Sequence, residues 1–339
     1  MIRFDSQLGW RLVANWSGAH RHHDYDVVYH INRSRFRGEA PEPHGGLTYA
    51  VLGDSFTFGQ GVGDEQTFVH LMAAADERRH AFLNLGVPGY STDQEYLLLE
   101  ERVVDFELDV VVLVAYLGND LFDNRLPFPL QGTQGKPLFR LDAGGLTLEN
   151  SPVPRRSKPA AARGTSLSSI VAGDDRAPKR SSLRTRVGRW EVFRRLGLFQ
   201  PRGPTSDEDF QRRFEPALKL FYALVDAMSV ACERHGARLE VVLLPGRSFV
   251  TNPESVSAHY QDYLRGRIVG DLTAVSIIDV ASMLRAAGGR SATEWYFPND
   301  GHLTPLGHRV VADFLLERLD VGSDGTSVAP QPRGRNQGK

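Results

Sequence analysis

The sequence predicts an α/β protein built around a central parallel sheet. From residue 47 onward, short apolar runs that end in turn residues alternate with longer segments in which apolar residues recur at helical spacing. The run at 109–117, DVVVLVAYL, is apolar almost throughout, which is typical of a strand buried on both faces of a sheet. These two observations indicate strand–helix units repeated along one large domain.

Composition places the chain among ordinary proteins of aqueous compartments and excludes several classes. It has 339 residues, of which 41% are hydrophobic and 24% charged, and a formal net charge of −1, so neither nucleic acid nor a membrane surface is expected as a partner. The single cysteine, Cys232, allows no intrachain disulfide and no cysteine metal cluster, and its helical apolar surroundings predict a core thiol. No apolar stretch approaches the ~18 residues of a membrane span, and the first residues lack the apolar core of a signal peptide, so the expected location is cytoplasmic.

Residues 1–46 precede the alternation and predict an irregular segment that packs on the larger domain. Aromatic residues lie here among Asn, Gly, His and Arg, and residues 26–31 form a short β-like piece. His20, His22 and His23 lie close together. Without cysteine or acidic ligands at a fixed spacing, they predict a solvated loop rather than a metal site.

The first half of the main domain contains three predicted strands, each ending in turn residues or glycine. The intervening segments have the apolar period of helices, and Thr92 can cap the second of them. The predicted elements are a strand at 47–52, a helix at 66–79, a strand at 82–85, a helix at 93–104 and a strand at 109–117.

Residues 127–207 interrupt the alternation and predict a long insertion. The stretch at 139–148, FRLDAGGLTL, predicts a hairpin that turns at 143–145. Residues 151–183 are rich in Pro, Ala, Ser, Gly and Arg and have no period, which is typical of a mobile segment, and a short amphipathic helix is expected at 189–199. The part between Arg155 and Arg195 has a net charge of +9, which fits a solvated surface or a lid that attracts an anionic substrate.

The alternation resumes after the insertion. The predicted elements are a helix at 208–236, a strand at 238–244, a helix at 254–269, a strand at 275–280 and helices at 281–287 and 305–319. The residues from 321 onward are Gly, Ser, Pro and Arg and predict a disordered tail. The expected organisation is an N-terminal segment at 1–46, a domain at 47–320 with its insertion at about 127–207, and a tail at 321–339.

Ser55 is the first candidate for chemistry. It follows the strand at 47–52 after Gly53 and Asp54, and glycine allows a tight turn at that point. Open α/β sheets place their sites at the C-terminal ends of parallel strands, and a serine that starts the next helix has its hydroxyl exposed beside backbone N–H groups. An acyl-transferring nucleophile needs that placement, although Gly-Asp-Ser is also an ordinary turn.

Candidates for the other parts of an ester-cleaving site lie at later strand ends. Gly89 has no side chain, so its N–H can approach a substrate closely, and Asn119 offers an amide donor; with Ser55 they would form an oxyanion hole. His302 can accept a proton near neutral pH, and Asp300 can fix its tautomer. Each residue also has a structural interpretation: Gly89 as a turn, Asn119 as a helix cap and His302 as a loop histidine. His308 is expected to be structural, packed on the last helix.

These stretches resemble the sequence blocks of the SGNH, or GDSL-like, hydrolase family. The matching stretches are Gly53-Asp54-Ser55 for the first block, NLGVPG at 84–89 for the second with Gly89 as oxyanion glycine, Gly118-Asn119-Asp120 for the third with Asn119 as oxyanion asparagine, and Asp300-Gly301-His302 for the fifth. The resemblance covers about 47–319 without the insertion, in the family's block order. It implies a flavodoxin-like three-layer α/β/α fold and a covalent acyl-serine mechanism with neither metal nor other cofactor.

The sequence departs from the family pattern in two places. Many members have the acid three residues before the histidine, where this chain has Asn299, whereas Asp300 is two residues before His302. Residues two apart in an extended loop can both face inward, and the alternative is a Ser-His dyad in which a backbone carbonyl holds His302. The third block is one residue shorter than G-x-N-D, but Asn119 keeps its place before Asp120.

Three functions fit these residues. The first is an esterase that forms an acyl-Ser55 intermediate and removes a short acyl group from a sugar or natural-product hydroxyl. The second is an O-acyltransferase with the same triad, which the motifs do not separate from the first. The third is a non-catalytic binding domain that holds a phosphate at Gly59-Gln60-Gly61, a loop without the lysine of a P-loop. The expected partner is a small-molecule ester or acyl acceptor, and the sequence indicates neither an oligomeric state nor particular substrate-binding residues.

Overall fold

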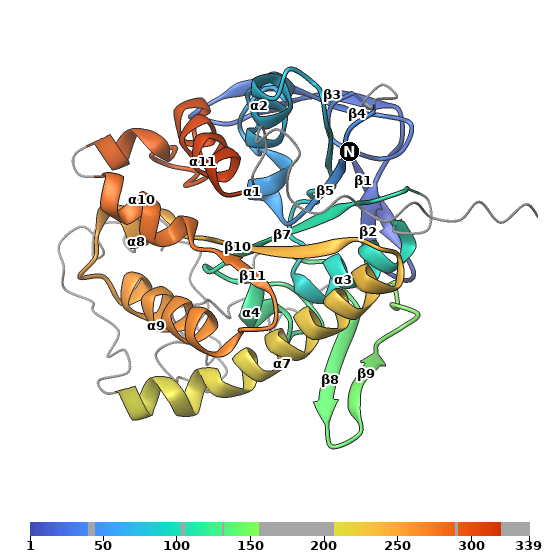
Figure 1. The fold of residues 1–339 in the computed structure, drawn as a ribbon, viewed down its shortest axis with the longest axis vertical. Coiled ribbons are helices and arrows are strands. Elements are labelled where there is room, and N and C mark those ends of the chain that lie inside the picture. The colour runs from blue at the N-terminus through green and yellow to red at the C-terminus, as the bar shows by residue number, and fades with distance from the viewer. Residues whose placement is uncertain (40–44, 103–105, 131, 156–206, 289–290, 320–339) are drawn as a thin grey trace, which may run out of the picture.

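The computed structural model of the chain describes residues 1–39, 45–102, 106–130, 132–155, 207–288 and 291–319 (Figure 1). The helix predicted at 189–199, most of the predicted insertion and the predicted tail lie outside these residues. None of the described helices combines the length and the hydrophobicity that crossing a membrane requires.

A five-stranded sheet forms the centre of the molecule, and each neighbouring pair of its strands is parallel (Figure 1). The apolar run at 109–117 forms the middle strand, which explains why it lacks a polar face. The predicted central parallel sheet is therefore confirmed. Across the sheet the strands are β11 (Ser276–Ile278), β10 (Arg238–Leu244), β7 (Val110–Tyr116), β5 (Thr48–Leu52) and β6 (Ala81–Asn84).

The order of the strands reverses between β5 and β7. The chain passes outward from β5 to the edge strand β6 and then returns to the other side of β5 to form β7, so the arrangement is the flavodoxin-like order 2-1-3-4-5. The loops that follow β5 and β7 consequently diverge to opposite faces of the sheet. A crevice between such loops, at the C-terminal strand ends, is where open α/β sheets bind ligands.

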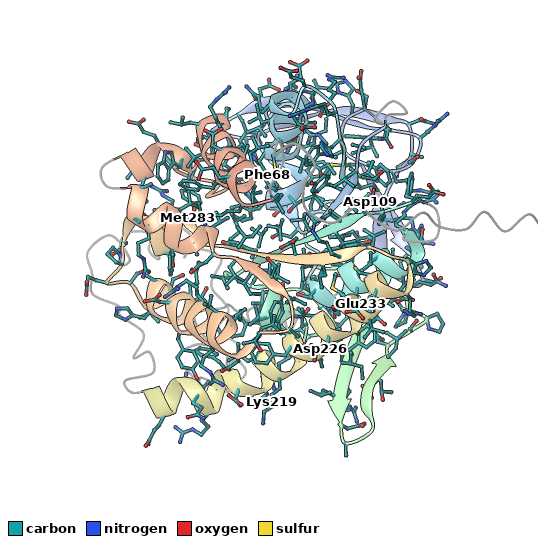
Figure 2. All side chains as sticks on the ribbon, viewed as in Figure 1. Phe68, Asp109, Lys219, Asp226, Glu233 and Met283 are labelled. Atoms are coloured by element: carbon teal, nitrogen blue, oxygen red, sulfur yellow. The ribbon has the colours of Figure 1, made fainter. Side chains whose placement is uncertain are left out.

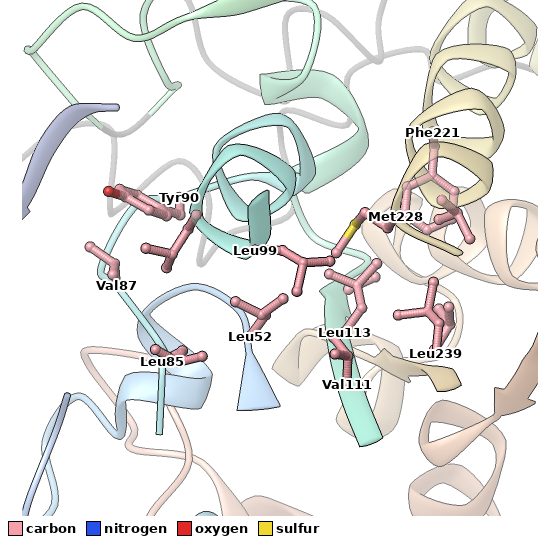
Figure 3. Close-up of a cluster of buried hydrophobic side chains, with 14 of the residues drawn as sticks. Leu52, Leu85, Val87, Tyr90, Leu99, Val111, Leu113, Phe221, Met228 and Leu239 are labelled. Atoms are coloured by element: carbon pink, nitrogen blue, oxygen red, sulfur yellow. The ribbon is translucent and has the colours of Figure 1, made fainter. Parts of the chain in front are cut away.

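Helices cover both faces of the sheet, because alternate side chains of each strand point to opposite faces. Val110, Val112 and Val114 pack in one core with α2 (Phe68–Ala75) and α11 (Pro305–Arg318). Val111 and Leu113 pack in the other core with α3 (Thr92–Arg102) and α7 (Asp207–Arg234) (Figure 3). The molecule therefore has three layers, α/β/α, as predicted. Its longer helices are α2 (Phe68–Ala75), α3 (Thr92–Arg102), α7 (Asp207–Arg234), α9 (Val256–Asp271), α10 (Val280–Gly288) and α11 (Pro305–Arg318), and its short ones are α1 (Ser55–Phe58), α4 (Asp120–Asp123), α8 (Arg247–Thr251) and the 3₁₀ helices η1 (Asp64–Gln66) and η3 (Ser291–Trp295).

The long helix α7 lies across one face of the sheet, with one side exposed and the opposite side buried. Lys219, Asp226 and Glu233 recur every seven residues, about two helical turns, and all are exposed (Figure 2). Met228 and Cys232 lie on the opposite side of the helix, fully buried in the core. The prediction that the single cysteine is a core thiol is confirmed.

The N-terminal segment packs on the domain, as predicted, but it is not irregular: it folds into two small antiparallel sheets. The strand expected at 26–31 is confirmed as β4. The indole Nε1 of Trp10 donates to the carbonyl of Pro88 at 3.0 Å, and Tyr29 belongs to the same apolar core as β5. The pairs are β1 (Ile2–Asp5) with β2 (Gly9–Leu12) and β3 (Trp16–Arg21) with β4 (Asp26–Ile31), and the predicted later hairpin is β8 (Leu138–Asp142) with β9 (Gly145–Glu149).

His308 on α11 is a buried structural histidine, as expected. Its Nδ1 accepts a hydrogen bond from the backbone N–H of Phe68 at 3.2 Å, at the start of α2. Burial lowers the pKa of His308 to about 3, so the ring stays neutral and remains an acceptor. It ties two helices of one layer together.

Candidate active site

Ser55 lies at the C-terminal end of β5, where α1 begins. A side chain at Gly53 would collide with its surroundings, since an added Cβ would lie 2.1 Å from Thr57 Oγ1 and 3.2 Å from the carbonyl oxygen of Val114. Asp54 caps α1, because its Oδ1 accepts a hydrogen bond from the N–H of Phe56 at 2.8 Å. The turn thus presents the hydroxyl of Ser55 to a cavity at the end of the sheet.

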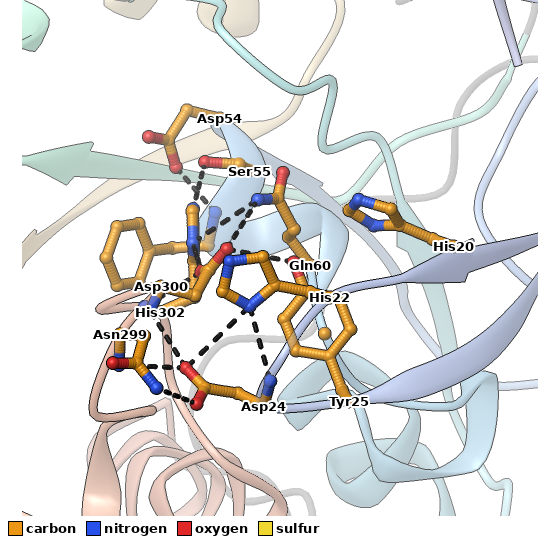
Figure 4. A network of polar contacts seen from close by, with 12 residues as sticks. His20, His22, Asp24, Tyr25, Asp54, Ser55, Gln60, Asn299, Asp300 and His302 are labelled. Carbon is orange, nitrogen blue, oxygen red and sulfur yellow. Dashed lines mark hydrogen bonds and ion pairs between the residues drawn. The ribbon is translucent and has the colours of Figure 1, made fainter. Parts of the chain in front are cut away.

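Two residues of the loop before α11 form a chain of contacts with Ser55 (Figure 4). Ser55 Oγ lies 2.7 Å from His302 Nε2, although the two residues are 247 positions apart. The other ring nitrogen, Nδ1, contacts Oδ1 of Asp300, which also accepts the backbone N–H of His302 at 3.3 Å. It is the carboxylate of Asp300 that holds the ring, and this arrangement favours the tautomer whose Nε2 can accept the serine proton.

The spacing of acid and histidine depends on Gly301. Its φ of +88° lies in the left-handed region, and the resulting turn lets side chains two residues apart meet. Asn299, at the position of the acid in many SGNH proteins, contacts another residue: its Nδ2 donates to Asp24 Oδ1 at 2.7 Å. The loop therefore brings Asp300 rather than Asn299 to His302.

Asp300 is held as an anion. Burial by itself would raise the pKa of Asp300, but hydrogen bonds from His302 and Tyr25 and the charge of His302 hold it well below the usual range. Tyr25 Oη donates to Oδ2 of Asp300 at 2.9 Å, and Gln60 Nε2 donates to the same oxygen at 3.4 Å. An ionised carboxylate in this place stabilises the ring of His302 when it takes up a proton.

Gly89 and Asn119 line the same cavity as Ser55. Gly89 follows β6 with a φ of +80°, a conformation that favours glycine. Asn119 follows β7, and its Nδ2 donates to Asp123 Oδ2 at 2.8 Å, which orients the amide and leaves its second hydrogen for a ligand. The structure thus brings all five predicted site residues to one cavity.

The cavity has a volume of about 840 Å³, within the range of small-molecule sites. It is lined by the loops that follow β5, β6, β7 and β10, by the loop before α11, by α9, and by β1 and β2 of the N-terminal segment. Its apolar wall includes Trp10, Phe56 and Pro88. Hydroxyl and amide side chains make up much of the remainder: Gln60, Tyr116, Thr133, Gln134, Ser248, Thr251, Asn252, Ser257 and Gln261.

Buried carboxyl groups lie next to Ser55. Burial raises the pKa of Asp54 to about 6, and burial together with repulsion from Asp54 and other nearby carboxylates raises the pKa values of Glu95 and Asp120 well above the ordinary carboxyl range. These shifts favour the neutral forms of Glu95 and Asp120 over their charged forms. Within the described part of the chain, no group of three or more His, Cys, Asp or Glu side chains is arranged to hold a metal ion.

Three residues that contact the candidate site residues were not predicted from the sequence. Tyr25, which contacts Asp300, lies 275 positions away in the N-terminal segment, so no local signal could have indicated it. Gln60 also contacts Asp300, but its loop suggested only a phosphate-binding alternative. Asp123 lies four residues after Asn119, about one helical turn, and this spacing could have indicated the contact.

Comparisons with known proteins found likeness only among solved structures. No family model and no curated protein matches the sequence. A lipase/acylhydrolase from Enterococcus faecalis is similar with a TM-score of 0.43 and 12% identity, over 80% of this chain and 95% of that one. An alpha/beta hydrolase enzyme from the metagenome of Lake Arreo, Spain, has a TM-score of 0.42 and 14% identity, over 84% and 99% of the two chains. A member of the lipolytic protein G-D-S-L family from Veillonella parvula has a TM-score of 0.40 and 13% identity, over 80% and 97%. Because these scores and identities are low, function has to be inferred from the site itself.

Proposed function

We propose that this chain is a serine esterase in which Ser55 is the nucleophile, His302 the general base and acid, and Asp300 the acid that orients the histidine. The observation that carries the proposal is the unbroken line of contacts from Ser55 Oγ through His302 to the Asp300 carboxylate. This line lies at the C-terminal end of β5, in a cavity large enough for a small molecule. The sequence blocks that resemble the SGNH family support the same assignment.

Acylation begins when Ser55 Oγ attacks the carbonyl carbon of the ester. The hydroxyl proton passes to His302 Nε2 while Asp300 stabilises the charged ring. The oxyanion accepts hydrogen bonds from Asn119 Nδ2 and from the backbone N–H groups of Gly89 and Ser55, the last of which starts α1 and has no intrahelical acceptor. His302 then gives the proton to the alcohol oxygen, the alcohol leaves, and the acyl group remains on Ser55.

Deacylation repeats these steps with water as the nucleophile. His302 takes a proton from the water, the oxyanion forms again, and the carboxylic acid leaves as Ser55 regains its proton. An alcohol in place of water would transfer the acyl group through the same intermediate. Hydrolysis and transfer therefore differ only in which acceptor reaches the acyl-serine.

The cavity lining favours a polar small-molecule ester. Its hydroxyl and amide groups can pair with the hydroxyls of a sugar or a hydroxylated natural product, and such groups select strongly for substrates that satisfy them. We propose a short acyl group on an alcohol of this class as the substrate.

Intact-mass spectrometry after mixing with activated acyl esters tests the proposal. We expect one acyl group on the parent protein and none on Ser55→Ala. Ser229→Ala is the matched control, because Ser229 lies on α7 and its hydroxyl contacts Glu233 rather than the cavity. Acylation of Ser55→Ala at the parent's rate would show that Ser55 is not the nucleophile.

A serine-reactive phosphonate and a panel of alcohols separate the alternatives. A binding domain without catalytic chemistry would not react stoichiometrically with the phosphonate at Ser55. An esterase would release carboxylic acid whichever alcohol is present, whereas an acyltransferase would convert a preferred alcohol into its ester.

A further inference from the structure

The turn between β3 and β4 reaches the loop that carries Asp300 (Figure 4). This turn spans residues 22–25 and belongs to the N-terminal segment, outside the α/β domain. Two of its side chains, Asp24 and Tyr25, hydrogen-bond the loop before α11. The segment therefore contributes directly to the surroundings of the proposed triad.

Tyr25 fixes the carboxylate oxygen of Asp300 that does not contact His302. Its hydroxyl donates to Oδ2 at 2.9 Å, while His302 occupies Oδ1. Tyr25 is 8% exposed, and its ring packs against those of Phe297 and His22, with ring centroids 5.2 and 5.1 Å away. Burial, together with the neighbouring Asp300, raises the pKa of Tyr25, so the phenol stays protonated and remains a donor.

Asp24 holds the backbone of the same loop. Its Oδ2 accepts the N–H groups of Asn299 and Asp300 at 2.9 and 2.8 Å, and its Oδ1 accepts the side-chain amide of Asn299 at 2.7 Å. The side chain of Asp24 is only 4% exposed. One carboxylate thus satisfies three donors of the loop and sets the direction in which Asp300 leaves the backbone.

We infer that Tyr25 and Asp24 are positioning residues of the active site, which makes the N-terminal segment a working part of it. Tyr25 stops the Asp300 carboxylate from rotating away from His302, and Asp24 keeps the loop in the conformation that brings the two together. This inference rests on the proposed esterase function and extends it to residues outside the α/β domain.

The Tyr25 contact also controls how strongly Asp300 acts on His302. A donor on Oδ2 draws negative charge away from Oδ1, and hence away from the histidine ring. The titratable groups around Asp300 are His302 from its own loop, Asp24 and Tyr25 from the turn at 22–25, and His20 and Tyr29 from the N-terminal strands, while Gln60 is its neutral neighbour. Loss of the Tyr25 hydroxyl should stabilise the protonated ring of His302. The acid limb of the plot of kcat against pH should therefore shift to higher pH.

Tyr25→Phe is the first test, because it removes one hydroxyl and keeps the packed ring. We expect kcat for an aryl ester to fall about 10- to 100-fold with KM within about twofold, and the pH of half-maximal kcat to rise by about half a unit. Tyr222→Phe is the matched control, since Tyr222 donates to Asp271 at 3.1 Å and does not line the cavity. Parent-like kcat and an unshifted pH profile in Tyr25→Phe would overturn the inference.

A pair of variants at Asp24 provides the second test. Asp24→Ala removes the acceptor of three N–H groups, and we expect at least a tenfold loss of kcat. Asp24→Asn should keep most of the parent's kcat, because the oxygen of the substituted amide can accept the two backbone N–H groups. The side-chain amide of Asn299 would then turn over, so that its oxygen accepts a hydrogen bond from the NH₂ of the substituted amide. Equal kcat values for Asp24→Ala and the parent would contradict the positioning role.

The proton resonance of His302 Nδ1–H distinguishes failure of this inference from failure of the proposed function. It reports the contact with Asp300 without turnover, and we expect it to move downfield in Tyr25→Phe as Oδ1 becomes a stronger acceptor. A shifted resonance in a protein whose parent cleaves no ester would support the positioning network and refute the esterase proposal. An active parent with an unchanged resonance in Tyr25→Phe would refute the positioning network and support the esterase proposal.

Discussion

Replacement of Asp123 by asparagine should stabilise the protein and impair the proposed oxyanion hole. Asp123 is 1% exposed, and its two oxygens accept the N–H of Leu130 and the amide of Asn119, each at 2.8 Å. Burial raises the pKa of Asp123 to about 6 despite these two hydrogen bonds. At neutral pH the carboxylate is therefore ionised at a cost to stability.

The size and the sign of the stability change follow from that pKa. Between the ordinary value of 3.8 and about 6, folded Asp123 binds more protons than the unfolded residue, so ionisation destabilises the fold increasingly as pH rises through this window. Above about pH 6 the full cost applies, roughly 3 kcal/mol at about 1.4 kcal/mol per pH unit. A neutral amide at this position carries no such cost, so we expect Asp123→Asn to match the parent near pH 4 and to exceed it by about 1–3 kcal/mol at pH 8.

The loss of activity has a separate cause. The backbone N–H of Leu130 cannot turn over, so the oxygen of the new amide should face Leu130 and its NH₂ should face Asn119. Asn119 must then turn its own amide to accept, which removes its donor from the oxyanion hole. One such donor contributes about 10²–10³ in rate, so we expect kcat to fall about 100-fold with little change in KM.

Urea unfolding at pH 4 and pH 8, together with kcat for an aryl ester, measures both effects on one pair of proteins. Asn119→Ala is the control for activity, because it removes the same donor and leaves the ionised Asp123. A stability difference that does not grow with pH would refute the role assigned to burial. A kcat within threefold of the parent would refute the coupling between Asp123 and Asn119.

Three further predictions concern the triad and the hole. Ser55→Ala should fold normally, as checked by thermal melting, and should lose ester cleavage by about a million-fold; a tenth of the parent's activity would exclude Ser55 as nucleophile. Asn119→Ala should lower kcat about 10²–10³-fold at nearly constant KM, whereas a raised KM with unchanged kcat would make Asn119 a binding residue. Asp300→Asn should lower kcat by up to about 10⁴-fold and Asn299→Ala only mildly, because the Asp300 carboxylate contacts His302 and Asn299 contacts Asp24. A severe loss of kcat in Asn299→Ala with a mild loss in Asp300→Asn would make Asn299, rather than Asp300, the third member of the triad.

The layout of the fold could be predicted because its signals are local. The run at 109–117 is apolar on both faces because it becomes the central strand, and the seven-residue recurrence of exposed residues in α7 follows from helical geometry alone. The positions of Ser55, Gly89 and Asn119 at strand ends were equally readable, since turn residues after apolar runs mark these ends. Parallel strands bring their C-terminal ends to one edge, so this much of the site follows from strand direction.

Contacts between distant segments were decided by the tertiary structure. The sequence left open whether Asp300 or a backbone carbonyl holds His302, and only the turn at Gly301 brings the carboxylate to the ring. Nothing near residue 25 indicates that Tyr25 reaches Asp300, 275 positions away. Periodicity records which face of an element is buried, but not which element covers it. The partner of a side chain is set by how the layers pack, and a hydrogen bond forms only where that packing brings donor and acceptor to within about 3 Å.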